Sequence, residues 1–193
     1  MYRGSAMRRI WIFLCFALCV GETSLQAGSS FFSINPLLSY RPYELHWAAA
    51  MDYDRNILEL EDGSQWKISD GDYLELVSWG KDDIVEISPN YFSYSYSYYM
   101  TNKDTGSYVR ANLVNAPLRD SPYAVTITGM DYRRSFSLSN GSSWEISTSD
   151  LSLVRNWYVD DLVIIGNNNE WFSFYSHILI NIHTNTYIRV QKI

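Results

Sequence analysis

The chain of 193 residues has a net charge of −6, and 16% of its residues are aromatic, with tyrosine the commonest of these. This length suits one or two domains. The acidic balance, with Lys and Arg scattered along the chain, argues against nucleic-acid binding, because phosphate contacts need clustered basic groups. The same balance argues against docking on an anionic membrane surface.

Residues 1–27 have the pattern of a secretory signal peptide. Three arginines precede residues 10–20, an apolar run that is too short for an ordinary membrane span. We expect cleavage after Ala27, with Gly21 as an alternative site and an uncleaved N-terminal anchor as the alternative to cleavage. Both cysteines lie in this run, so the mature protein would contain no disulfide and no reactive thiol. The sequence therefore predicts an exported protein, whether periplasmic, at the cell surface or secreted, with no membrane span after cleavage.

Prolines divide the rest of the chain. Pro36 and Pro42 bias the residues before them away from helix, which indicates an extended lead-in. Pro117 and Pro122 stiffen a polar stretch that we interpret as a linker. The predicted division is a lead-in over 28–42, a first β-module over 43–114, a linker over 115–122 and a second β-module over 123–193.

A turn with alternating flanks organises each module. The sequence LEDGSQWKIS at 60–69 returns as LSNGSSWEIS at 138–147. Apolar and polar residues alternate on both sides of Asp62-Gly63 and of Asn140-Gly141, which is typical of two half-buried strands joined by a tight turn. These dipeptides predict a two-residue type I′ turn, in which both central residues have positive φ.

The duplication extends over nearly all of the chain after the lead-in. Sequence numbers in the two copies differ by 78 or 79, and no stretch shows a convincing long helical period. Turn motifs at close spacing predict an all-β fold of two tandem, homologous modules, each a small β-barrel or sandwich of five to six short antiparallel strands. We expect the repeated tryptophans to lie in the two cores: Trp66 and Trp144, Trp79 and Trp157.

Carboxylates that recur in both copies are the first candidates for chemistry. They would suit a Ca²⁺ site or an acid/base pair. Aspartates in turns commonly bond neighbouring backbone N–H groups, and we favour that interpretation. The recurring carboxylates are Asp72 and Asp150, and Asp82-Asp83 and Asp160-Asp161.

One arginine also recurs, as Arg110 and Arg189. Each follows a tyrosine by two residues near the end of its copy, on a predicted strand. Because both the arginine and the aspartates are duplicated, we expect each arginine to form a structural ion pair with one repeated aspartate.

The histidines do not predict a metal site. His46, His177 and His183 are not repeated between the copies, and none has metal-ligand spacing to another histidine or a cysteine. The chain also shows no nucleophile elbow and no glycine-rich phosphate loop. We therefore assign no catalytic residue, no metal ligand and no cofactor.

The alternation of tyrosine and serine over residues 91–99 is the most unusual stretch. It predicts a strand with Tyr94, Tyr96 and Tyr98 on one face, and the second copy has Trp171 and Phe172 in the corresponding stretch. Flat amphipathic rings suit stacking on sugars or anchoring of a protein partner. They also suit one face of a core strand, and that is the interpretation we favour here.

Three motifs together carry a resemblance to a known group of proteins. D/N-G-S-x-W-x-I, W-x-x-D-D-x-V-x-I and N-x-x-T-x-x-Y-x-R each occur in both copies. The chain resembles exported tandem-repeat proteins of chlamydia-type intracellular bacteria, over nearly all of its predicted mature length. In that group the second motif usually reads W-x-x-G-D, and here Asp82 and Asp160 stand at the place of its glycine. The resemblance implies the tandem architecture and no activity.

These observations predict an exported, non-catalytic binding protein whose ligand is a glycan or a protein in the envelope or outside the cell. A structural or assembly component of a cell-envelope complex is the first alternative, and a hydrolase that uses carboxylates is the second. Exposure of the aromatic residues distinguishes binding from packing, because a contiguous exposed apolar patch marks an interaction site.

Overall fold

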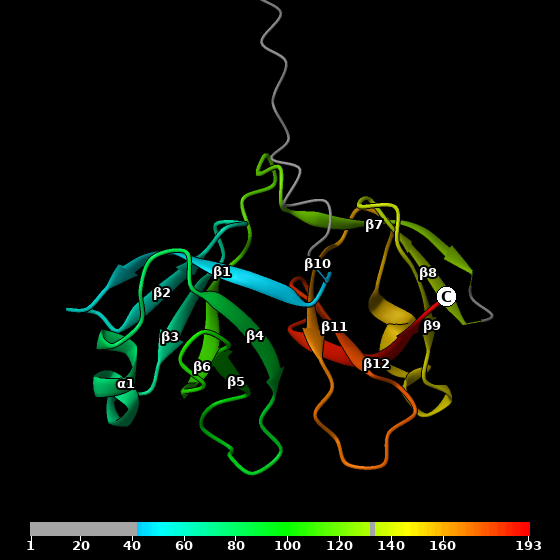
Figure 1. Cartoon of the computed structure of the whole chain (residues 1–193). Helices are drawn as coiled ribbons and strands as arrows, with labels where there is room; N and C mark the ends of the chain where they lie inside the picture. Colours follow the sequence, from blue (N-terminus) through cyan, green and yellow to red (C-terminus); the bar gives the residue numbers. More distant parts are fainter. Residues whose placement is uncertain (1–41, 132–133) are drawn as a thin grey trace, which may run out of the picture.

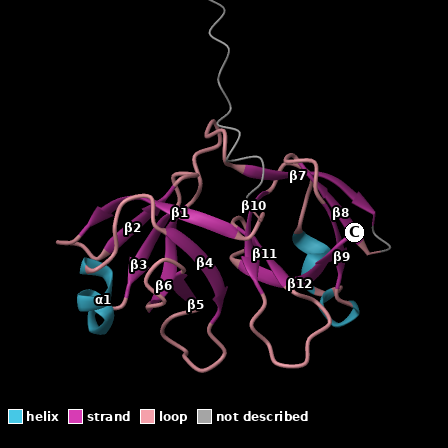
Figure 2. Ribbon diagram, viewed as in Figure 1, coloured by secondary structure: helices cyan, strands magenta, loops and turns pink. Residues whose placement is uncertain are grey.

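The computed structural model describes residues 42–131 and 134–193, which form two closed antiparallel β-barrels in tandem (Figures 1 and 2). The predicted all-β fold is confirmed, and each module is a barrel. The predicted signal peptide and nearly all of the predicted lead-in lie outside the described residues. The first barrel contains strands β1 (Leu45–Asp52), β2 (Ile57–Leu60), β3 (Gln65–Ile68), β4 (Ile84–Pro89), β5 (Tyr98–Asn102) and β6 (Tyr108–Asn115).

The second barrel repeats the first, strand for strand. The neighbour order is β1-β2-β3-β6-β5-β4 in one barrel and β7-β8-β9-β12-β11-β10 in the other, and both rings close. Closure removes the unpaired strand edges that would otherwise invite aggregation. The second set comprises β7 (Val125–Asp131), β8 (Ser135–Leu138), β9 (Ser143–Ile146), β10 (Leu162–Asn167), β11 (His177–Asn181) and β12 (Thr186–Lys192).

Short helical turns link the two halves of each barrel. They follow β3 in the first copy and β9 in the second, where the chain crosses from one group of three strands to the next. They are the 3₁₀ turn η2 (Asp70–Asp72) and helix α1 (Tyr73–Val77) in the first barrel, and the 3₁₀ turns η3 (Thr148–Asp150) and η4 (Leu153–Asn156) in the second.

The hairpin turn differs from the predicted type I′ turn. Gly63 has φ 83°, but Asp62 does not adopt positive φ. Gly63 N–H donates to the Leu60 carbonyl at 2.9 Å, and Leu60 N–H donates to the Ser64 carbonyl at 3.0 Å. The loop therefore has three residues, with glycine alone in the left-handed region. The Asp62 carboxylate accepts the Ser64 N–H at 2.8 Å, which stabilises this wider loop. The copy around Asn140-Gly141 has the same bonds.

The serine after each turn satisfies a buried tryptophan. Trp66 donates its indole N–H to Ser64 Oγ at 2.9 Å, and Trp144 donates to Ser142 Oγ at 2.7 Å. Both indoles are fully buried, so an unpaired N–H would be costly. The predicted core positions of Trp66, Trp144, Trp79 and Trp157 are all confirmed.

The paired aspartates are turn residues, as we favoured from the sequence. Asp82 has φ 70° and Asp160 has φ 73°, in the region that favours glycine. This is the place of the glycine in W-x-x-G-D. The neighbouring carboxylate of Asp83 accepts the Gly80 N–H at 2.7 Å and the Asn102 side-chain amide at 2.6 Å. Asp161 makes the same two kinds of bond in the second copy.

The two barrels pack against each other through β4 and β10 (Figure 1). Ile164, Ile178 and Ile180 point out of the second barrel and join the apolar cluster of the first. Gly166 permits the close approach, because a Cβ there would lie 2.6 Å from the Ile87 carbonyl oxygen. The interface is therefore apolar and tightly fitted.

A buried histidine adds a polar bond across the interface. His46 on β1 contacts Glu61 through Nδ1 and the Ile165 carbonyl of the second barrel through Nε2, both at 2.8 Å. Burial alone would lower the pKa of His46, but the Glu61 carboxylate outweighs it and raises the pKa to about 9. A protonated ring donates from both nitrogens, which matches the two acceptors.

Candidate ligand-binding site

Two aromatic loops extend from the same end of the molecule (lower edge of Figure 1). One loop, residues 90–97, joins β4 to β5, and the other, residues 168–176, joins β10 to β11. Exposed aromatic side chains gather on them, with relative exposures from 83% for Trp171 to 110% for Tyr94. We call these two loops the aromatic loop pair. Their most exposed rings are Phe92, Tyr94, Trp171, Phe172 and Phe174.

The prediction that Tyr94, Tyr96 and Tyr98 share one strand face is wrong. Strand β5 begins only at Tyr98. Tyr94 is fully exposed, Tyr96 is partly buried, and Tyr98 is 3% exposed against Trp66 and Tyr187. The core interpretation therefore holds for Tyr98 and fails for Tyr94.

Side-chain bonds to the backbone explain why this stretch is a loop. Asn90 Oδ1 accepts the Phe92 N–H at 3.1 Å, and Ser93 Oγ accepts the N–H groups of Ser95 and Tyr96 at 3.2 and 3.3 Å. Such local bonds compete with the ladder bonds of a sheet. The alternating pattern therefore did not produce a strand.

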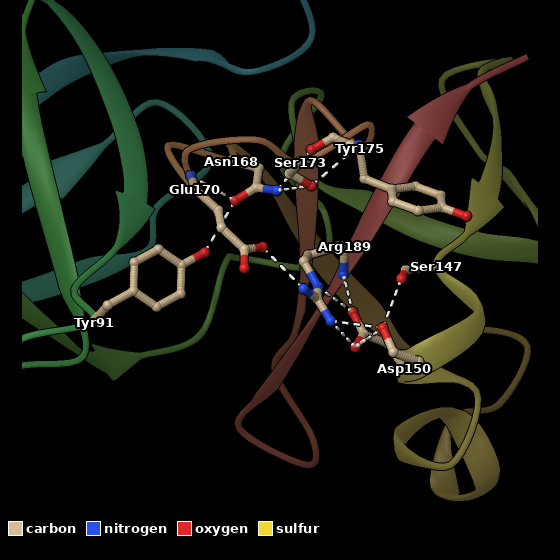
Figure 3. A network of polar contacts seen from close by, with 9 residues as sticks. Tyr91, Ser147, Asp150, Asn168, Glu170, Ser173, Tyr175 and Arg189 are labelled. Carbon is tan, nitrogen blue, oxygen red and sulfur yellow. Dashed lines mark hydrogen bonds and ion pairs between the residues drawn. The ribbon is translucent and has the colours of Figure 1, made fainter.

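The second loop is fixed by one asparagine. Asn168 donates its side-chain amide to Ser173 Oγ at 2.9 Å and to the Tyr175 carbonyl at 2.6 Å (Figure 3). Its Oδ1 accepts the Glu170 N–H at 3.1 Å and the Tyr91 hydroxyl at 2.9 Å. The Tyr91 bond comes from the first loop, so it joins the two loops of the pair.

A polar pocket of about 420 Å³ lies beside the loops, where the two barrels meet. The first barrel contributes Tyr91, Ser97 and Tyr98. The second contributes mainly polar and charged side chains, among them Asp150, Glu170, Tyr187 and Arg189. The pocket is therefore complete only when both barrels are in place.

Arg189 is the centre of this pocket. Its backbone N–H and Nε donate to Asp150 Oδ2 at 2.8 and 3.0 Å, and Nη2 donates to Oδ1 at 2.8 Å. Nη1 donates to Glu170 Oε2 at 2.9 Å, and Nη2 also donates to Ser149 Oγ at 2.7 Å (Figure 3). The guanidinium thus joins β12 to the loop that carries Trp171.

The pKa directions show that the pocket is charged near neutral pH. Burial alone would raise the pKa of Asp150, but the hydrogen bonds from Arg189 outweigh it and hold that pKa below its usual range. Hydrogen bonds to Asp150 and Glu170 raise the pKa of Arg189. Burial raises the pKa of Tyr91 and of Tyr98, so both phenols stay neutral.

The first barrel has the same arginine pair in a simpler form. Arg110 donates its backbone N–H, Nε and Nη2 to Asp72, each at 2.8 Å. The predicted pairing of the repeated arginine with a repeated aspartate is therefore confirmed in both copies. Gly71 stands where the second copy has Ser149, and among the described residues no ion pair joins Arg110 to the loop between β4 and β5.

The expectation that the chain has no metal ligand stays a prediction. Within residues 42–131 and 134–193, no cluster of three or more His, Cys, Asp or Glu side chains could hold an ion. His46 lies at the barrel interface, and His177 pairs with Glu44 at 3.3 Å. Among the helices of the same residues, none combines the length and apolar character needed to cross a membrane.

Sequence reasoning missed several residues of the site: Tyr91, Phe174, Glu170 and Tyr187, together with the role of Asn168. Asn90 and Asn168 align in the duplication, which was a usable indication that the two loops share an anchor. Glu170 has no acidic counterpart in the first copy, so the repeat could not reveal it.

Comparison of the chain with protein-family models, with curated proteins and with solved structures found no match in any of the three. The resemblance to exported tandem-repeat proteins of chlamydia-type bacteria stays a prediction.

Proposed function

We propose that the chain is an exported, non-catalytic binding protein that holds a glycan on the aromatic loop pair. The observation that carries this proposal is the exposure of five large rings on two neighbouring loops. Exposing such rings to water costs free energy, and contiguous patches of this kind on soluble proteins commonly mark interaction sites.

Hydrogen bonds order the backbone of the loops that carry the rings. Asn168, Ser93 and Ser173 accept or donate bonds within the loops, and Asn112 on β6 bonds Ser95 and Ser97 of the first loop at 2.7 and 2.8 Å. A loop ordered in advance loses less conformational entropy when a ligand binds. Exposed rings carried on such ordered loops suit stacking on flat sugar faces.

The adjoining polar pocket favours a glycan over a protein partner. Sugar hydroxyls need hydrogen-bond partners beside the stacking ring, and the pocket offers carboxylate, phenol and guanidinium groups next to Tyr91. Such a combination of apolar surface and a few placed polar groups is typical of small-ligand sites.

The non-catalytic part of the proposal rests on the carboxylates. A hydrolase of the glycosidase type needs one carboxyl kept protonated by a raised pKa. The pKa of Asp150 is instead lowered, and both of its oxygens accept bonds from Arg189.

A glycan array probed with the chain from residue 28 onward tests the proposal. We expect retention of at least one glycan class, and a loss of about tenfold or more in the variant Trp171→Ser/Phe172→Ser, because stacked and buried aromatic contacts dominate such sites. Tyr53→Ser is the control, since Tyr53 is an exposed tyrosine on another loop. Retention that is unchanged in the double variant, or no retained glycan at all, contradicts the proposal.

The alternative of a structural or assembly component makes a different prediction. If the aromatic loop pair packs against further subunits, the purified chain should associate with itself as its concentration rises. Sedimentation velocity distinguishes the two, because a glycan-binding monomer keeps one sedimentation coefficient across the concentration series.

A further inference from the structure

We infer that the pocket beside the loops takes an uncharged, hydroxyl-rich sugar residue and disfavours acidic sugars. This inference rests on the proposed glycan binding and adds the class of glycan. Three observations support it. They are the charges of Asp150, Glu170 and Arg189, the open acceptor atom Oε1 of Glu170, and the position of Tyr91 where the two loops meet.

The single cation of the pocket is already neutralised. Asp150 accepts hydrogen bonds from Nε and Nη2 of Arg189, and Glu170 accepts one from Nη1 of the same arginine. The pocket therefore has two carboxylates against one guanidinium, which leaves an excess of negative charge. An acidic sugar would add a third negative group to a site that has no spare cation, and like charges placed together oppose binding.

One carboxylate oxygen remains available to a ligand. Glu170 uses Oε2 for Arg189, and among the described residues Oε1 has no hydrogen-bond donor. A carboxylate oxygen is an acceptor, so it suits the hydroxyl groups of a sugar, and charge-assisted bonds of this kind are the stronger ones. The Tyr91 hydroxyl donates to Asn168 Oδ1 at 2.9 Å and also interacts with the Tyr187 side chain, so the open acceptor of the pocket is Glu170 Oε1.

The size and place of the pocket agree with this ligand. Its volume of about 420 Å³ lies within the range of small-molecule sites, about 300–1,000 Å³. Tyr91 and Glu170 belong both to the pocket and to the aromatic loop pair. A glycan could therefore place one residue in the pocket while its next residues stack on the exposed rings.

The substitution Glu170→Gln tests the inference on a panel of neutral oligosaccharides and their uronate- or sialate-terminated counterparts. Binding is measured by titration calorimetry and by the fluorescence of the exposed Trp171. We expect the wild type to favour neutral glycans by about tenfold or more, which one charge-assisted hydrogen bond can supply. Glu170→Gln should weaken neutral binding and at the same time reduce the preference over acidic glycans.

The change in preference separates ligand contact from mere positioning of the loop. A loop that is only displaced would lose neutral and acidic glycans in equal proportion. Glu86→Gln is the matched control, because it removes one negative charge and one ion pair, with Lys103 at 3.4 Å, from the first barrel. We expect no change in the control.

Each outcome decides between the two proposals. Equal binding of neutral and acidic glycans, or an unchanged preference in Glu170→Gln, overturns the inference. The proposed glycan binding still stands in that case, provided that Trp171→Ser/Phe172→Ser weakens binding by about tenfold or more. If the wild type binds no glycan of either class, both proposals fail.

Discussion

The outer faces of β4 and β10 show how the two barrels have come to differ. Their inner faces are alike, with Val85 and Ile87 in the first core and Val163 and Ile165 in the second. At the outward position between them, the first barrel has Glu86 and the second has Ile164. Glu86 pairs with Lys103, whereas Ile164 is 1% exposed against the first barrel. Barrel closure thus fixed the inner positions equally, and the outer positions diverged to make the interface.

The loops next to these strands differ in a related way. Asn168 donates two hydrogen bonds within its loop, whereas the buried side-chain amide of Asn90 finds no partner among the described residues. The second loop also has the bond from Glu170 to Arg189. The second copy therefore supplies most of the polar pocket, and the first supplies Tyr91.

The largest expected effect comes from giving the second barrel the residue of the first. Ile164→Glu places an unpaired carboxylate in the apolar interface, which should lower the free energy of unfolding by about 4 kcal/mol, in the range for an uncompensated buried charge. The reverse change, Glu86→Ile, removes only the ion pair with Lys103. It should shift the free energy of unfolding by less than about 1 kcal/mol. Urea unfolding measures both. Equal effects of the two substitutions would mean that the outer faces are not specialised.

The second prediction concerns His46, whose counterpart on β7 is Val125, because they pair with Val85 and Val163 respectively. The pKa of His46 is about 9 in the folded protein and near 6.5 in the unfolded chain. The contribution of His46 to the stability of the fold is therefore complete below pH 6.5, and it is lost as the pH rises through about 9. The difference corresponds to about 3 kcal/mol of unfolding free energy.

Chemical denaturation between pH 6 and pH 10 checks this prediction. In His46→Val the protein is less stable at every pH, because Glu61 loses its partner, and the slope between pH 6.5 and 9 disappears. A slope that persists in this variant would assign the pH dependence to other groups.

A smaller effect is expected where the barrels approach most closely. Gly166→Ala places a Cβ 2.6 Å from the Ile87 carbonyl oxygen, so backbone must move. We expect a loss of about 2 kcal/mol, as for an overpacked core. Gly129→Ala is the matched control on β7, because its Cβ would meet only Ser137 at 3.6 Å, an ordinary contact. Thermal unfolding of the two variants measures the difference, and equal melting temperatures would contradict a tight interface at Gly166.

Much of the fold could be read from the chain because a duplication shows each pattern twice. Alternation around Trp66 and Trp144 predicted the hairpins, and the joint repetition of aspartate and arginine predicted the pair of Asp72 with Arg110. The prediction of a type I′ turn was wrong because the Asp62 carboxylate accepts the Ser64 N–H, a bond that the alternation of residues does not report. The prediction of a tyrosine strand was wrong for a similar reason, because the side chains of Asn90 and Ser93 accept bonds from nearby backbone N–H groups.

The sequence by itself determined the two all-β modules, their buried tryptophans and their repeated ion pairs, because these depend on the parity of side chains along strands and on residues that recur together. Only the tertiary structure decided which outer face is covered, which rings stay in water, and that Tyr91, Glu170 and Arg189 meet in one pocket. Parity says which side of a strand a residue takes, but what lies against that side depends on how the second barrel packs on the first.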